Sequence, residues 1–155
     1  MKTISLWAKW DSIPSGQSII YVDYKSKTGL GLMSTGILCS SRGLASYTFS
    51  KSSIVANTWY HFVVVSPNGA TDATRKLYIN GVEQTTTSNT SNWYYTIDEL
   101  QVGKRSITSD GFTGKIVDFR MYATALTPAQ IKELYTTSMS VDSNGNVYAR
   151  ELSEL

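Results

Sequence analysis

The chain of 155 residues is 41% hydrophobic and 17% charged, which is typical of a globular domain that buries a core. Its net charge of +2 includes no run of either sign, so the basic stripe expected of a nucleic-acid-binding protein is missing. The single cysteine, Cys39, excludes an internal disulfide, and the sequence has neither a signal-peptide pattern nor the roughly 18 apolar residues that membrane insertion needs.

Short apolar or alternating segments, separated by Gly, Asn, Ser and Pro, follow one another along the chain. Near its start, Ile4, Leu6 and Ala8 share one face, which predicts a strand. The segment that follows Trp59 carries apolar or aromatic side chains on both faces, which indicates a central strand covered on both sides. The strands predicted in this half of the chain are 3–10, 18–25, 29–35, 45–50 and 59–65.

A β-hairpin is predicted around Asn80-Gly81, because a type I′ turn needs positive φ at both central residues. Two further strands, 99–105 and 114–122, complete the set. Many short strands at this spacing predict an all-β protein, an antiparallel sandwich or jelly roll.

One short helix is predicted after these strands. Thr127 is a suitable N-cap, Pro128 would occupy the first helical position, and Gln130 completes a capping box. Leu126 and Ile131 are spaced to form a hydrophobic staple. A helix this short needs a docking surface, so we expect it to cover an open end or edge of the sandwich.

The last residues, 139–155, are expected to form a separate hairpin extension that turns at Asn144-Gly145. The stretch around Asp142 superficially suggests a calcium loop. However, its glycine falls at the fourth position instead of the sixth, so a simple turn is favoured.

Five segments in order, "TISLWAKW", "NTWYHFVVV", "RKLYINGVEQ", "ELQVGKR" and "FTGKIVDFRMYATALTPAQIKELY", resemble the laminin G-like, concanavalin A-like jelly-roll family. The resemblance covers most of residues 1–138. Its strongest part is the last segment, where a Phe-x-Gly-x-Ile-x-Asp strand precedes the capped helix. It implies an antiparallel jelly-roll β-sandwich with one short C-terminal helix.

Two features depart from this family. Its members usually carry another strand ahead of residues 3–10, so either the chain is a fragment or one edge is completed in another way, for example by the C-terminal hairpin. The ending "GNVYARELSEL" is similar to the ends of bacteriophage tail and virion proteins. It implies a virion component or another extracellular location.

Catalysis is not expected. Glucanases of this fold carry a Glu-x-Asp-x-Glu strand that places two carboxylates on one face, and the nearest acidic pair here, Asp98-Glu99, would point to opposite faces. Jelly-roll lyases pair Tyr with His, but we expect the single histidine, His61, to be buried and hydrogen-bonded within its strand.

A metal site is a second question. In many relatives the residue equivalent to Asp118 binds a structural calcium, so the resemblance implies calcium here. The alternative, which we favour, is an ion pair with Arg120 on the same strand. Zinc is excluded because the chain has no cluster of His and Cys.

Glycan binding needs an exposed aromatic platform with polar neighbours. The segment 87–100 contains five such candidates, Asn89, Asn92, Trp93, Tyr94 and Tyr95. A second loop adds Arg105, Ser109 and Asp110, for which a solvated turn is the favoured interpretation. Strand alternation requires one of the three aromatic rings to point inward. Trp7 and Trp59 match family positions that are usually buried, so the resemblance implies that both lie in the core.

The sequence therefore favours a module that binds and does not catalyse. The expected partner is a cell-surface glycan, bound weakly by each domain and more strongly by many copies on one particle. A purely structural virion module, in contact with other assembly proteins or forming a homo-oligomer, is the alternative. A hydrolase or lyase of the same fold is the third option.

Overall fold

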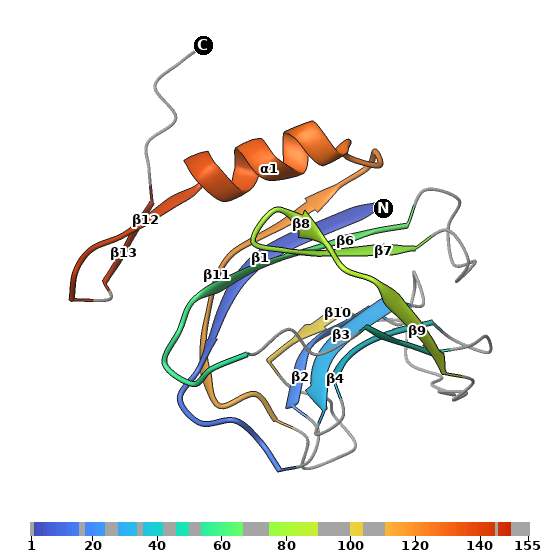
Figure 1. Ribbon diagram of the computed structural model, residues 1–155, viewed down its shortest axis with the longest axis horizontal. Helices are drawn as coiled ribbons and strands as arrows, with labels where there is room; N and C mark the ends of the chain where they lie inside the picture. Colours follow the sequence, from blue (N-terminus) through green and yellow to red (C-terminus); the bar gives the residue numbers. More distant parts are fainter. Residues whose placement is uncertain are drawn as a thin grey trace.

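Two antiparallel sheets stacked face to face form the body of the protein (Figure 1). The computed structural model describes residues 2–15, 18–23, 28–33, 36–41, 46–49, 54–66, 75–89, 100–103, 111–144 and 146–149. Among these residues one sheet has five strands, in the order β11 (Gly114–Tyr122), β1 (Thr3–Trp10), β6 (Tyr60–Val65), β7 (Lys76–Ile79) and β8 (Val82–Glu83).

The second sheet of the described chain has six strands. Their order is β10 (Leu100–Val102), β2 (Ser18–Asp23), β3 (Thr28–Met33), β4 (Gly36–Ser41), β5 (Ser46–Phe49) and β9 (Thr86–Asn89). The chain crosses from one sheet to the other after β1, β5, β8 and β10. The predicted all-β antiparallel sandwich is therefore confirmed.

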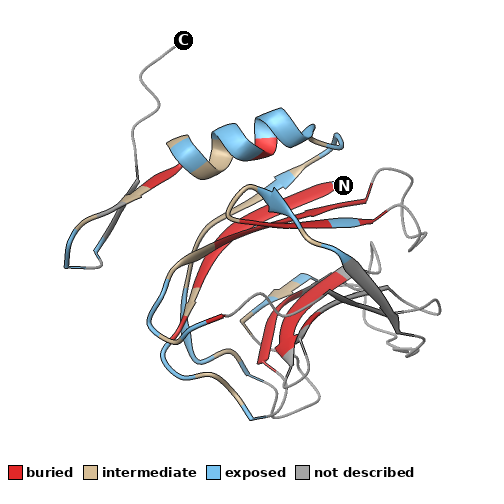
Figure 2. Cartoon of the chain, viewed as in Figure 1, coloured by how far each residue is buried: buried red, intermediate tan, exposed pale blue. Residues whose placement is uncertain are grey.

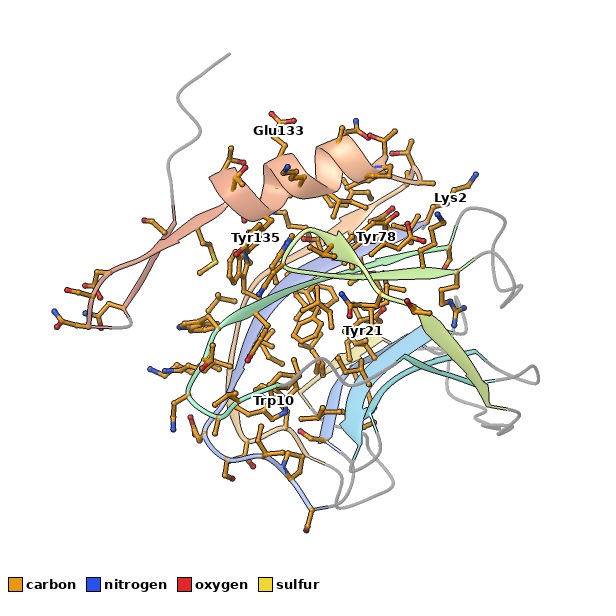
Figure 3. The ribbon with its side chains drawn as sticks, in the orientation of Figure 1. Lys2, Trp10, Tyr21, Tyr78, Glu133 and Tyr135 are labelled. Carbon is orange, nitrogen blue, oxygen red and sulfur yellow. The ribbon has the colours of Figure 1, made fainter. Side chains whose placement is uncertain are left out.

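The inner faces of the two sheets enclose one apolar core (Figure 2). Alternate residues of β1 point into it and all are buried: Ile4, Leu6, Ala8 and Trp10. Trp10 meets Phe62 edge to face at 5.8 Å, and its indole N–H donates to Ser18 Oγ at 3.1 Å. Buried residues of the second sheet, among them Tyr21, complete the core from the other side (Figure 3).

Two glycines in the five-stranded sheet occupy backbone conformations with positive φ. Asn80 and Gly81 have φ values of 51° and 76°, which confirms the predicted hairpin turn between β7 and β8. Gly114 has φ of 150°, and a Cβ there would lie only 2.0 Å from the carbonyl oxygen of Lys9. Only glycine lets β11 approach β1 so closely at this point.

The helix α1 (Pro128–Thr137) begins with the predicted capping box. The backbone N–H of Gln130 donates to Thr127 Oγ1 at 3.3 Å, and the backbone N–H of Thr127 donates to Gln130 Oε1 at 2.9 Å. Leu126 and Ile131 pack in the same apolar cluster, as expected of a hydrophobic staple. Nothing helical in the described chain is long and apolar enough to span a membrane.

The position of α1 corrects the expectation that it covers an end or edge of the sandwich. The helix lies on the outer face of the five-stranded sheet, where Ile131 packs with Val63, Val65 and Tyr78 (Figures 1 and 3). The reason is β6, which carries buried apolar residues on both faces, so its outer face also needs a cover.

The C-terminal strands pair with each other, and among the described residues they do not complete an edge of either larger sheet, which was one of the alternatives. β12 (Met139–Val141) and β13 (Val147–Ala149) pair with each other in a separate two-stranded sheet. Their turn is organised by Asp142, whose carboxylate accepts hydrogen bonds from the backbone N–H groups of Asn144 and Asn146. Asp142 therefore stabilises the turn through its side chain.

Candidate functional site

One of the predicted glycan-binding residues lies in the part of the chain that the structure describes. Asn89 is the last residue of β9. The other candidates, Asn92, Trp93, Tyr94, Tyr95, Arg105, Ser109 and Asp110, lie outside the described residues.

The ends of the second candidate loop are held against the sandwich. The backbone N–H of Phe112 donates to the carbonyl of Gly103 at 2.8 Å, and that of Gly103 donates to Ile20 at 2.8 Å. Phe112 also contacts Trp10, with ring centroids 5.2 Å apart. A rigid frame of this kind is where binding loops commonly begin and end.

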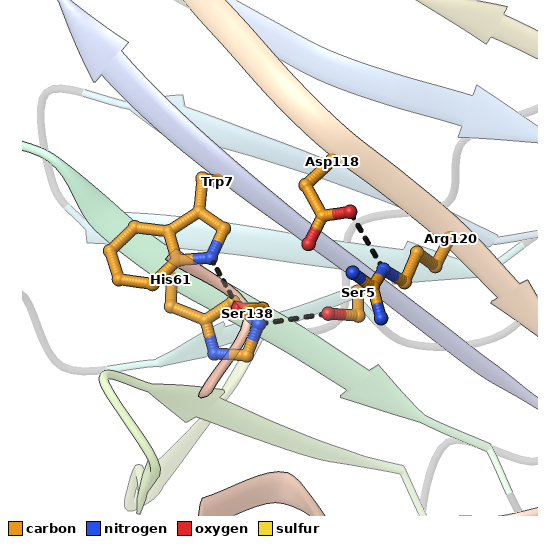
Figure 4. A network of polar contacts seen from close by, with 6 residues as sticks. All are labelled: Ser5, Trp7, His61, Asp118, Arg120 and Ser138. Atoms are coloured by element: carbon orange, nitrogen blue, oxygen red, sulfur yellow. Dashed lines mark hydrogen bonds and ion pairs between the residues drawn. The ribbon is translucent and has the colours of Figure 1, made fainter. Parts of the chain in front are cut away.

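A polar and aromatic group, here called the outer-face cluster, lies on the other side of the molecule, at the five-stranded sheet (Figure 4). Its members are Ser5, Trp7, His61, Asp118, Arg120, Tyr135 and Ser138. Alternation along β1 directs Ser5 and Trp7 away from the core, and the register places Trp7 opposite His61 of β6. The loop between α1 and β12 brings Ser138 onto this surface.

His61 is buried, as predicted. Its Nε2 lies 2.8 Å from Ser5 Oγ, and its ring is flanked by Trp7 at 5.1 Å and Tyr135 at 6.1 Å between centroids. Burial and the nearby positive charge of Arg120 lower the pKa of His61 from 6.5 to about 4. The imidazole is therefore neutral near pH 7 and shielded from solvent, which suits a structural role.

Trp7 links the two ends of the described chain. Its indole N–H donates to Ser138 Oγ at 3.0 Å, and its ring stacks on Tyr135 at 5.7 Å. Tyr135 lies in α1 and Ser138 is its C-cap, so both contacts hold the C-terminal end of the helix against β1. The prediction that Trp7 is buried is confirmed, although it is covered by the helix and not by the second sheet.

Asp118 lies at a β-bulge. Ser5 pairs with Arg120 but Trp7 pairs with Val117, so two residues of β11 oppose one residue of β1. Asp118 has φ of 53°, a conformation that Asp tolerates better than most residues. The bulge directs its carboxylate to the outer face, where it accepts a hydrogen bond from Arg120 Nε at 2.7 Å. The predicted ion pair is confirmed.

One oxygen of the Asp118 carboxylate is already engaged, which limits its use as a calcium ligand. Arg120 already holds Oδ1, and Oδ2 is buried without a hydrogen-bond partner among the described residues. Calcium needs six to eight oxygen ligands, and no group of three or more His, Cys, Asp or Glu side chains gathers in the described chain. A guanidinium this close also repels a cation. Calcium at Asp118 therefore stays an implication of the resemblance, with Oδ2 as the carboxylate oxygen that Arg120 leaves open.

The structure shows one group of outward residues that the sequence interpretation missed. Lys9 pairs with Lys115 across β1 and β11, and Lys9 Nζ lies 5.6 Å from the ring centroid of Trp59. Trp59 is only half-buried and is not part of the inter-sheet core, which corrects the expectation for it. Strand alternation from Trp7 to Lys9 was the signal that could have placed Lys9 on the outer face.

Comparison with known proteins defines the family. A laminin G family model, described as the concanavalin A-like lectin/glucanases superfamily, matches residues 2–132. Comparison with curated proteins finds no significant match.

Several solved structures share the fold. One is domain 4 of AbnA, an extracellular arabinanase from Geobacillus stearothermophilus in complex with arabinotriose, at 24% identity and a TM-score of 0.60, covering 86% of this chain and 65% of that one. A Bacteroides ovatus protein described as carbohydrate-binding has 17% identity and a TM-score of 0.65, covering 99% and 46%. Trypanosoma rangeli sialidase in complex with 2,3-difluorosialic acid has 16% identity and a TM-score of 0.59, covering 86% and 22%.

The chain thus spans less than two thirds of each of these proteins. At such identities the likeness shows the shared fold alone. The family model, by contrast, matches most of the sequence directly. The chain therefore belongs to the concanavalin A-like lectin/glucanase superfamily.

Proposed function

We propose that the protein is a non-catalytic carbohydrate-binding module. The residues that contact the sugar lie between β9 and β10 in the sequence and are here called the rim residues: Asn92, Trp93, Tyr94 and Tyr95. One observation carries this proposal: β9 and β10 form the two opposite edges of the six-stranded sheet. Asn89 ends one and Leu100 begins the other. The rim residues between them in the sequence have side chains of the types that stack on sugar rings and hydrogen-bond to their hydroxyl groups.

The described polar groups support binding over catalysis. His61, which a lyase would need as an accessible base, is shielded beneath α1 and engaged by Ser5. Asp118 is engaged by Arg120, and Glu83 by Lys76 and Tyr78.

The solved structures with this fold include a Bacteroides ovatus protein described as carbohydrate-binding and an arabinanase domain in complex with arabinotriose. The proposed setting is a phage tail, virion or similar extracellular assembly, which rests on the likeness of the last residues to virion proteins. Many copies on one particle would convert weak binding by each domain into firm attachment to a cell-surface polysaccharide.

A glycan array tests the proposal. The unmodified chain should be retained by a defined set of glycans, Trp93→Ala should lose that retention, and Trp93→Phe should keep most of it because a smaller ring still stacks. The melting temperature of each variant controls for folding.

The other outcomes decide between the alternatives. Retention that survives Trp93→Ala would remove this site, and unfolding of that variant would identify Trp93 as a core residue. An array without hits favours a structural assembly module. Shortening of a polysaccharide during incubation would show an enzyme.

A further inference from the structure

Three side chains form a row across the outer face of the five-stranded sheet. Lys9 of β1 lies in the middle, with Lys115 of β11 opposite it in the register and Trp59 on the other side. Lys115 is exposed, and Lys9 and Trp59 are half-buried. The next row of the sheet holds Trp7, which Tyr135 covers, so the lysine row lies beyond the contact between α1 and the sheet.

The two lysines form an unfavourable pair in the protein alone. Residues opposite each other in an antiparallel ladder have Cα atoms roughly 4.5–5.5 Å apart, and like charges at such positions destabilise the sheet. The ion pairs of the described residues join Lys76 to Glu83 and Arg120 to Asp118, and neither Lys9 nor Lys115 takes part in them.

The indole N–H of Trp59 is a hydrogen-bond donor without an acceptor among the described residues, and it is shielded from solvent. The Trp59 ring holds the ammonium group of Lys9 at 5.6 Å, which limits the freedom of that long side chain before any ligand arrives. An aromatic surface beside two cations is complementary to a ring that carries a negative charge.

We propose that Lys9, Lys115 and Trp59 form a binding site for an acidic saccharide. The two ammonium groups hold one carboxylate or sulfate, because both flexible stems start from neighbouring positions and can converge on a single anion. The indole contacts the apolar face of the same sugar unit. This site lies on the five-stranded sheet, whereas β9 and β10 belong to the six-stranded sheet; only the choice of a saccharide over another anion rests on the proposed function.

Affinity electrophoresis tests the site with four polymers: polygalacturonate, dextran sulfate, neutral dextran and polyglutamate. The unmodified chain should be retarded by the two acidic polysaccharides and not by dextran. Lys9→Gln/Lys115→Gln should weaken the binding of polygalacturonate about tenfold or more, because two charge-assisted contacts are lost. Trp59→Leu should weaken it as well, since the aromatic surface is removed.

A matched double variant controls for net charge. Lys2→Gln/Lys132→Gln removes two exposed lysines elsewhere and should change the affinity by less than about twofold. Equal weakening by both double variants would overturn the site, as would the absence of retardation by either acidic polysaccharide. Equal affinity for polyglutamate would overturn the assignment of a saccharide.

The same experiment separates this site from the rim. Binding of polygalacturonate that depends on Lys9 and Lys115 but not on Trp93 supports the outer-face site, even where the glycan array shows no neutral ligand. Binding that Trp93→Ala abolishes and Lys9→Gln/Lys115→Gln leaves intact would assign the acidic saccharide to the rim and overturn the outer-face site. Melting temperatures near that of the unmodified chain show that each variant is folded.

Discussion

The inner face of the five-stranded sheet is covered by the second sheet and part of the outer face by α1, through different chemistry. The inner face presents apolar side chains to the second sheet, as Leu6 and Phe62 do. The outer face presents Ser5, Trp7 and His61 to the helix and to the residues that follow it. Contacts on the inner face depend on shape and area, whereas the outer face combines the apolar packing of Ile131 with hydrogen bonds between particular donors and acceptors.

This difference separates two roles. The inner face holds the sandwich together, since its buried residues come from both sheets. The outer face fastens α1 and β12 to the first strand, through residues as far apart in the chain as Trp7 and Ser138. We therefore expect damage on the inner face to unfold the protein and damage on the outer face to release the helix.

The largest effect should come from Phe62→Ala, compared with Val63→Ala next to it. Phe62 faces the core and Val63 faces α1, and both are buried. We expect Phe62→Ala to lower the free energy of unfolding by about 3–5 kcal/mol, and Val63→Ala by roughly 2 kcal/mol.

Urea unfolding measures both losses of stability. Limited proteolysis shows whether the helix is released alone or the whole sandwich unfolds. The Val63→Ala protein should be cleaved first near α1 while the sandwich persists. Simultaneous loss of the helix and the sandwich in both variants would show that the two faces form one cooperative unit.

Acid should destabilise the protein through His61, which lies on the outer face. The pKa of His61 is about 4 in the folded chain, below its usual 6.5, so the unfolded state takes up the proton first as the pH falls. The stabilising contribution is complete above about pH 6.5 and is lost between that pH and about 4. The loss should be on the order of 3 kcal/mol.

Urea unfolding at several pH values measures this loss, and His61→Phe is the control. The variant cannot titrate at this position, so its stability should change less across the same range. An identical pH dependence in both proteins would assign the acid sensitivity to other groups.

A smaller effect is expected at the hydrogen bond between Trp7 and Ser138. Trp7→Phe keeps a stacking ring but removes the donor, and should cost about 1 kcal/mol. Ser138→Ala leaves the indole N–H buried without a partner, and should cost about 1–3 kcal/mol.

A double-mutant cycle measured by thermal unfolding isolates this interaction. The double variant should lose less stability than the sum of the single losses, because no donor is then left unpaired. Strict additivity would show that the hydrogen bond contributes nothing to fastening the helix.

The smallest effect should be that of calcium. Because Arg120 holds the carboxylate of Asp118 at 2.7 Å, the melting temperature should be the same with calcium and with a chelator. A rise with calcium that Asp118→Asn abolishes would contradict this expectation. Asn is the suitable control because it tolerates the positive φ at this position.

Local sequence signals predicted much of the fold. Alternation in residues 3–10 predicted which side chains of β1 point into the core. Asn80-Gly81 predicted a hairpin, and the capping box of Thr127 and Gln130 predicted the start of α1. The ion pair of Asp118 with Arg120 was predicted from their spacing of two residues, which places both on one face of a regular strand, but the β-bulge at Asp118 was not predicted. Each of the predicted features depends on residues close in the chain.

The candidate sites were less predictable. The row of Lys9, Lys115 and Trp59 requires the register of three strands, and nothing in the separate segments shows that these residues are neighbours. The same holds for the contact between Ser5 and His61. The rim residues around Trp93 were proposed from composition alone.

The sequence alone determined the elements, because turn geometry, capping and alternation are decided within a few residues. Only the tertiary structure decided that α1 covers the outer face, that His61 is shielded by Tyr135, and that two lysines meet beside Trp59. Strand order and register bring these residues together from distant parts of the chain, and no local pattern encodes that pairing.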